Sequence, residues 1–200
     1  AAWQEIRDIA AAARALGTGA SAYVRLAADS PSVAMEDDLA NASRVAEAVA
    51  AAYAQAEVNV WLDTFNDVDR GYFPRAGLVD RRYNPRMAGH VLRNLHSALA
   101  GATGDFAMGD SLAIHGGRVL TLRAGREMWF VVLPEREVSI DSLPLPAESQ
   151  NTTRHGEWID LVNGEIRTLT CSVGKSGGET ALRIDHPLTC STPALFCLSL

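Results

Sequence analysis

The sequence predicts an α/β unit with parallel strands, followed by an antiparallel β-sandwich. Two observations lead to this fold class. Up to about residue 100 of the 200, the chain is rich in alanine and carries apolar residues at helical spacing; beyond it, Gly, Thr and Val alternate with turn signals. The segment GATGD at 101–105 separates the two patterns as a turn-like linker. We therefore expect one domain over residues 1–102 and a second over 103–200.

The first half is expected to begin as helix, strand, helix. Residues 2–16 form a helix that ends at Gly17, and its apolar face carries Trp3, Ile6, Ile9, Ala13 and Leu16. The mostly apolar run SAYVRLAA, residues 21–28, predicts a buried strand. A second helix is expected over about 33–55, with an acidic first turn that suits the positive end of the helix dipole.

A second strand and a third helix complete this half. VNVWLDTF predicts the strand, and the helix is expected to begin at Asn84 as N-cap, with Pro85 in its first position, and to end at Gly101. Short connections predict parallel strands with right-handed crossovers. A sheet of only two such strands, apolar on both faces but covered by helices on one, would be incomplete. We expect another chain, or an upstream segment of a longer protein, to complete the sheet.

The second half is rich in strand-forming residues. Its runs of strand-like residues are separated by Gly-rich or Pro-rich turns: RVLTLRAG, EMWFVVLP, GEWIDLV, GEIRTLTCSV and ETALRIDH. Asn163-Gly164 is the strongest hairpin signal in the chain. Short strands at this spacing favour an antiparallel sandwich of about a hundred residues.

The composition argues against two classes of partner. The formal net charge is −6 and the chain has no basic run, so we do not expect it to bind nucleic acid. No apolar run approaches the ~18–20 residues that span a bilayer, and residues 1–17 lack the layout of a signal peptide. We therefore expect no membrane partner.

The three cysteines, Cys171, Cys190 and Cys197, lie in the last thirty residues and match no zinc-binding spacing. One interpretation is that they are small buried side chains in strands. The alternative is a Cys171–Cys190 disulfide, which would indicate an oxidising compartment.

The segment between residues 57 and 99 carries the best candidate site. A strand that ends in Trp61 and Asp63, then a long polar loop and a helix, is the layout of a βα-barrel unit, where chemistry lies at the C-terminal end of the strand. An indole can stack on the C–H face of a sugar, while carboxylates and guanidinium groups bind its hydroxyls. The predicted substrate contacts are Trp61, Asp63, Asp69, Arg70, Tyr72 and Arg75.

An alternative for the same loop is internal pairing, in which Asp69 or Asp80 holds Arg70, Arg75 or Arg82. We expect no metal, because Asp63, Asp67 and Asp69 are not spaced as in an EF-hand loop. We also expect no cofactor: the sequence has no phosphate-binding loop and no nucleophile elbow, and its five histidines are scattered.

The sequence from 58 to 95 resembles the end of the barrel in retaining glycoside hydrolases of the large (β/α)8 clan. The matching residues are Trp61, then Gly77-Leu78-Val79-Asp80, then Asn84-Pro85-Arg86. The resemblance implies that this strand and helix are the eighth of a barrel, and that 21–28 and 33–55 are its seventh strand and helix. The later half is similar to the sandwich that often follows such barrels, in WIDLVNGEIRTL and PLTCSTPALFCLSL.

The chain departs from this clan where catalysis is concerned. The resemblance implies a nucleophilic glutamate at the end of the seventh strand, but Arg25 or Leu26 stands there. The acid/base glutamate belongs to a fourth strand, which this sequence does not contain, so the catalytic residues are unassigned. We expect a glycoside hydrolase-like protein that cleaves glycosidic bonds when the remaining barrel units are present. The alternatives are a non-catalytic carbohydrate-binding or assembly protein and an unrelated α/β protein that pairs its strands with a partner.

Overall fold

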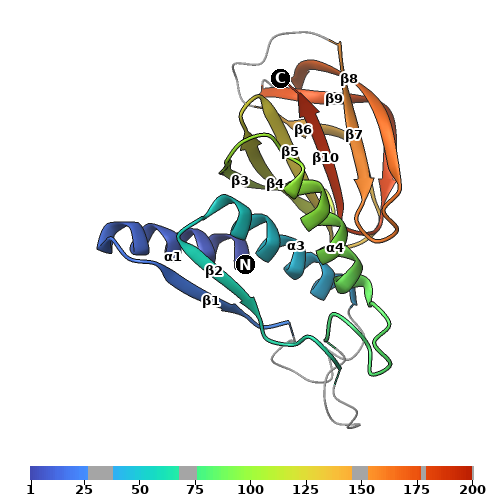
Figure 1. Ribbon diagram of the computed structural model, residues 1–200. Helices are drawn as coiled ribbons and strands as arrows, with labels where there is room; N and C mark the ends of the chain where they lie inside the picture. The colour runs from blue at the N-terminus through green and yellow to red at the C-terminus, as the bar shows by residue number, and fades with distance from the viewer. Residues whose placement is uncertain (27–37, 68–75, 146–152, 177–178, 200) are drawn as a thin grey trace.

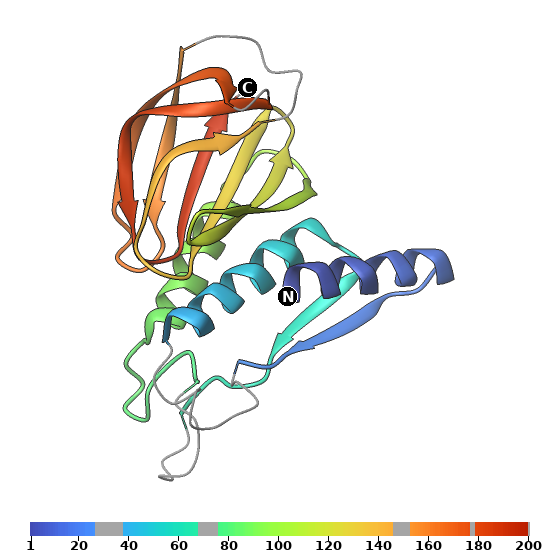
Figure 2. The same cartoon turned by 180° about the vertical axis from the view of Figure 1, so that it is seen from behind.

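The computed structural model describes residues 1–26, 38–67, 76–145, 153–176 and 179–199. The first half contains α1 (Ala2–Leu16), β1 (Ala20–Val24), α3 (Asp38–Ala54), β2 (Val58–Leu62) and α4 (Met87–Ala100). Figures 1 and 2 show α3 between two sheets, the pair β1–β2 on one side and a large β-sheet on the other. No helix of the described ranges is long and apolar enough to cross a membrane.

The strands β1 and β2 pair in parallel, from Ala20 opposite Val58 to Val24 opposite Leu62. Ala22, Val24 and Val58 are buried on the side of the helices. The expectation that the strands are apolar on both faces was wrong. The opposite face carries exposed polar and aromatic side chains: Ser21, Tyr23, Asn59 and Trp61.

The first helix has the predicted bounds. Gly17 closes α1 in the left-handed conformation, with φ of 63°, a conformation that glycine adopts without a steric penalty. Leu16 lies outside the expected apolar face, with 78% of its surface exposed. Of the second predicted helix, α3 is described from Asp38 onward, and the expected start near Val33 lies outside the described residues.

The third helix begins later than predicted. Its N-cap is Arg86 rather than Asn84, and its first residue is Met87. Asn84 instead gives its side-chain amide and its backbone N–H to the carboxylate of Asp80, and Pro85 forms a β-bridge with Val79. These contacts hold residues 84–85 in the preceding turn, so the helix starts only after them.

The second half forms one eight-stranded sheet in which every neighbouring pair is antiparallel. Along the sheet the order is β3-β4-β5-β10-β7-β8-β9-β6. The strands are β3 (Phe106–Ile114), β4 (Gly117–Ala124), β5 (Glu127–Pro134), β6 (Val138–Pro144), β7 (Thr153–Asp160), β8 (Ile166–Ser176), β9 (Glu179–Cys190) and β10 (Ala194–Ser199). Figure 1 shows that this single sheet curls upon itself.

The hairpin predicted at Asn163-Gly164 joins β7 to β8, and Gly164 has a φ of 77°. The connection is longer than a two-residue turn, because Ile159 is the last residue of β7 to pair, opposite Ile166. The carboxylate of Asp160 accepts the backbone N–H groups of residues 162 and 163 and so closes the turn.

Two hydrophobic cores share the strands of the large sheet. One lies inside the curl and includes the fully buried rings of Phe130 and Phe196. The other combines the helices with the opposite faces of β4, β5 and β10, through Leu122, Val131 and Leu195. β4, β5 and β10 therefore bury both of their faces. The second of these cores joins the two halves of the chain. The division at residue 102 remains a prediction.

All three cysteines are free thiols, so the alternative of a Cys171–Cys190 disulfide was wrong. Cys171 and Cys190 are buried, and Cys197 is half-buried. Burial is the main cause that raises the pKa of Cys171 and Cys190 to about 11 and that of Cys197 to about 12. The thiols are therefore protonated at neutral pH.

We expect the folded chain to resist alkylation at pH 8, because the thiolate is the reactive form. The folded pKa values lie above the ~8.5 of a free thiol, so the unfolded state loses these protons first. Stability is therefore expected to fall as the pH rises from about 9 towards 11. Mass spectrometry after iodoacetamide treatment, with and without urea, checks the first effect. Rapid labelling of the native chain at pH 8 would contradict it.

Candidate functional site

The two parallel strands present an aromatic pair on their uncovered face. Tyr23 and Trp61 are direct neighbours in the β1–β2 register. Their ring centroids lie 6.4 Å apart, and the ring planes differ by 18°. Both rings lie close to the C-terminal ends of their strands. Tyr23 and Trp61 have 78% and 53% of their surface exposed, so both rings are accessible to a ligand.

Asp63 connects the ends of the two strands. Its backbone N–H donates to the carbonyl of Val24 (3.2 Å), and its Oδ1 accepts the backbone N–H of Leu26 (3.0 Å). From α3, the guanidinium of Arg44 donates to the carbonyls of Arg25 (2.7 Å) and Leu26 (3.1 Å). The chain that leaves β1 is therefore held from both sides, with one oxygen of Asp63 engaged in this structural role.

The loop that follows β2 has a tightly closed base. The N–H of Val79 donates to the carbonyl of Phe65 (3.0 Å), and the N–H of Asp67 donates to the carbonyl of Val79 (3.1 Å). The N–H of Gly77 donates to Asp67 Oδ1 (2.8 Å). These bonds fix where the chain leaves the base at Asp67 and where it returns at Gly77.

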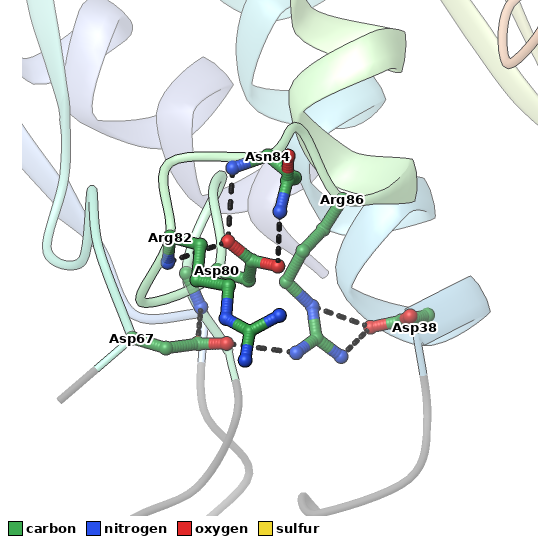
Figure 3. Close-up of polar contacts among 7 residues, drawn as sticks. Asp38, Asp67, Asp80, Arg82, Asn84 and Arg86 are labelled. Carbon is green, nitrogen blue, oxygen red and sulfur yellow. Dashed lines mark hydrogen bonds and ion pairs between the residues drawn. The ribbon is translucent and has the colours of Figure 1, made fainter. Parts of the chain in front are cut away.

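Arg86 holds this base to the start of α3 (Figure 3). Its Nη1 donates to Asp67 Oδ2 (2.8 Å), and its Nε donates to Asp38 Oδ1 (3.0 Å). Burial acts to lower the pKa of Arg86, but the hydrogen bonds to Asp38 and Asp67 outweigh it and raise the pKa. We call Asp38, Asp67 and Arg86 the arginine clasp. It joins α3, the loop base and the N-terminus of α4.

Asp80 organises the turn before α4 (Figure 3). Its Oδ1 accepts the backbone N–H groups of Arg82 (2.7 Å) and Asn84 (2.9 Å), and its Oδ2 accepts the side-chain amide of Asn84 (2.9 Å). These hydrogen bonds, led by that from the Asn84 side chain, lower the pKa of Asp80. Within the turn, Tyr83 adopts a φ of 63°, which is rare for a bulky residue.

The structure places two of the six predicted substrate contacts. Trp61 and Asp63 lie together at the strand ends, whereas Asp69, Arg70, Tyr72 and Arg75 lie outside the described residues. The alternative of internal pairing stays a prediction: Asp80 accepts the backbone N–H of Arg82 and the side chain of Asn84, and Asp69, Arg70 and Arg75 lie outside the described residues.

Sequence reasoning did not single out Tyr23 or the arginine clasp as parts of the site. The register of Tyr23 opposite Trp61 becomes visible only once the strands are paired. Arg86 directly follows Asn84-Pro85 in the sequence, but its partners Asp38 and Asp67 are 48 and 19 residues away, so the sequence does not signal these pairs. Within the described ranges, no three His, Cys, Asp or Glu side chains lie close enough together to hold a metal ion.

Comparison with known proteins gives matches in structure alone. No family model and no curated sequence matches the chain. A family 30 subfamily 8 xylanase, Xyn30A from Clostridium acetobutylicum, matches 94% of this chain with a TM-score of 0.54 at 11% identity. A family 39 glycoside hydrolase from Bacteroides cellulosilyticus WH2 matches 90% with a TM-score of 0.53 at 14% identity. A glucosidase from Croceicoccus marinus matches 97% with a TM-score of 0.52 at 12% identity.

The chain shares its fold with part of these glycoside hydrolases. The matched regions cover 44% of the xylanase, 34% of the family 39 enzyme and 50% of the glucosidase. The chain thus spans about a third to a half of the length of these structures. At such low identity the likeness concerns the fold, and it does not carry over catalytic residues or substrates.

Proposed function

We propose that this chain is the C-terminal part of a glycoside hydrolase: the last βα units of a (β/α)8 barrel and the β-sandwich that follows. The exposed indole of Trp61, at the C-terminal end of a parallel strand in a glycoside-hydrolase-like fold, is the observation that carries this proposal. That end of a barrel strand is where active sites of such folds are built.

In this proposal the chain supplies one wall of the sugar pocket. Trp61 stacks on the C–H face of a pyranose ring, and the second carboxylate oxygen of Asp63 accepts a hydroxyl hydrogen bond. From the loop, Asp69, Arg70, Tyr72 and Arg75 complete the polar rim. The reaction is hydrolysis of a glycosidic bond by two carboxylates, one as nucleophile and one as general acid/base, from other barrel units.

The proposed protein partner is the remainder of that barrel, from an upstream segment or another chain. Parallel sheets are almost always covered on both faces, whereas β1–β2 exposes Ser21, Tyr23, Asn59 and Trp61 on one of them. A groove of about 400 Å³ runs between α1 and β1 and leaves room beside this pair. We propose that one neighbouring strand of the barrel pairs with β1 there and that another pairs with β2 on its opposite edge. The mildly acidic chain suits a carbohydrate ligand better than nucleic acid or a membrane surface.

The test is Trp61→Ala in the full-length gene product that carries this chain, assayed on aryl glycosides. Removing the indole is expected to cost about 2 kcal/mol of transition-state binding, which lowers kcat/KM by about 30-fold. Trp61→Phe keeps an aromatic face and is expected to retain most of the activity. Ile166→Ala removes another exposed apolar side chain, at the β7–β8 turn, and serves as the control. Unchanged turnover and sugar affinity in Trp61→Ala would contradict the proposal.

A non-catalytic carbohydrate-binding or assembly protein is the second candidate. It is favoured by Arg25, which lies exposed beyond the end of β1 where the related enzymes are expected to carry a glutamate. The same assay separates the two candidates. Turnover that disappears on replacement of a single glutamate excludes the non-catalytic protein, whereas sugar binding without any turnover supports it.

A further inference from the structure

The aromatic pair has a spacing that limits how a sugar can bind. Two rings can hold a sugar between them only if each lies about 3.5–4 Å from it, which needs a separation of roughly 7–8 Å. The centroids of Tyr23 and Trp61 are 6.4 Å apart and the planes are tilted by 18°. The gap is too narrow for a third ring, so a ligand can stack only on an outer face of the pair.

The two rings also differ in what they offer to a ligand. The indole of Trp61 is the larger surface, and Asp63 follows two residues later, with its Oδ1 held by the backbone N–H of Leu26. Among the described residues, Tyr23 is the one aromatic ring that packs against Trp61. Tyr23 is therefore the ring placed to support the orientation of the indole.

We propose that Tyr23 and Trp61 form a single sugar-stacking wall, in which Tyr23 backs the indole and a pyranose ring of a neutral glycan stacks on the opposite indole face. This inference rests on the proposed carbohydrate function and adds Tyr23 to the site as a positioning residue. The ring of Tyr23, rather than its hydroxyl, carries this role, because the contact with Trp61 is between ring faces.

The tryptophans provide a selective probe of this wall. The chain has four, and Trp3, Trp129 and Trp158 are buried, with 1%, 6% and 6% of their surface exposed. Trp61, at 53%, is the one that a soluble quencher reaches. Iodide quenching of the intrinsic fluorescence therefore reports on Trp61, and a stacked sugar is expected to reduce it without any need for turnover.

The experiment titrates the chain with xylohexaose, cellohexaose and maltohexaose and measures protection from iodide. We expect at least one of these glycans to protect Trp61 in the wild type. Tyr23→Phe is expected to keep the wild-type Kd, and Tyr23→Ala is expected to weaken binding by about five-fold, the size of a lost aromatic pair. Tyr83→Ala removes a similarly exposed tyrosine, at 69%, from the turn after the loop, and is expected to bind like the wild type.

The outcomes separate the two proposals. If none of the three glycans protects wild-type Trp61, the wall is overturned, whereas the proposed carbohydrate function is decided by the turnover of Trp61→Ala in the full-length gene product. If a glycan protects the wild type and Tyr23→Ala binds it equally well, only the wall is overturned. Equal losses in Tyr23→Phe and Tyr23→Ala would assign the effect to the hydroxyl and overturn the backing role. Circular dichroism of each variant confirms that the comparison is between folded chains.

Discussion

Replacing Glu47 by alanine is expected to lower the free energy of unfolding by about 3 kcal/mol, the usual cost of breaking a buried ion pair from one side. Glu47 lies on α3 with 1% of its surface exposed. Its carboxylate pairs with Arg118 on β4 and accepts the backbone N–H of Trp3 (3.1 Å). Alanine would leave both donors without this partner. Urea denaturation of the wild type and the variant measures the difference.

Two further variants make this result specific. Glu165→Ala removes an exposed glutamate paired with Arg167, and little change in stability is expected because such surface pairs are weak. The double variant Glu47→Met with Arg118→Met removes both charges and is expected to recover part of the loss. Equal losses of unfolding free energy in Glu47→Ala and Glu165→Ala would show that the buried pair stabilises the fold no more than a surface pair does.

The same pair bears on how the two halves unfold. It joins α3 to β4, and the hydrophobic core that contains Trp3 and Val45 also contains Leu120 and Trp129 from the large sheet. Loosening this junction therefore exposes apolar surface of both halves at once. A single cooperative transition is the expected behaviour of such a shared core.

Elements with strong local signals could be predicted from the sequence. The helix over residues 2–16 carries its apolar stripe and its glycine stop within one stretch of chain, and the strand Glu127–Pro134 is a continuous apolar run. The hairpin at Gly164 requires a positive φ, which the sequence signals by glycine itself. In each case, the determining contacts lie within a few residues of one another.

The strands β3 and β6 were missed because their patterns are interrupted. The register of β3 shifts between Met108 and Ser111, and that of β6 between Ile140 and Ser142, so neither strand keeps a simple alternation. The pairing of all eight strands in one curled sheet depends on contacts between distant segments, such as β6 with β9. Local periodicity does not encode that order, and the two-sheet sandwich remains a prediction.

The candidate site likewise has one part that the sequence predicts and one that it does not. The positions of Trp61 and Asp63 follow from where a parallel strand ends, which the sequence signals directly. The arginine clasp joins Arg86 to Asp67, 19 residues away, and to Asp38, 48 residues away. The acidic residue at the start of α3 was assigned to the helix dipole, and its partner became visible only in the folded chain. Long-range ion pairs of this kind have no local signature.

Gly77→Ala is expected to destabilise the chain by about 3 kcal/mol, at the upper end of the usual cost of overpacking a tight site. A Cβ at position 77 would lie 2.7 Å from the nitrogen of Asp67, 2.8 Å from the carbonyl oxygen of Val79 and 2.9 Å from the carbonyl carbon of Asn66. All three are backbone atoms, so no side chain can rotate away to make room. Chemical denaturation measures the loss, and Gly19→Ala is the matched control, because its Cβ would approach nothing closer than 3.8 Å.

The clash should act through the arginine clasp, because Gly77 and Arg86 bind the two oxygens of the same Asp67 carboxylate. Pushing the backbone at position 77 away from Asp67 also disturbs the oxygen that Arg86 holds. Combining Gly77→Ala with Arg86→Ala should therefore cost less than the sum of the two single changes, with a coupling of about 1 kcal/mol or more. Strict additivity would mean that the glycine and the clasp stabilise the loop base independently, and a neutral Gly77→Ala would remove the physical reason for a glycine in the Gly77-Leu78-Val79-Asp80 segment.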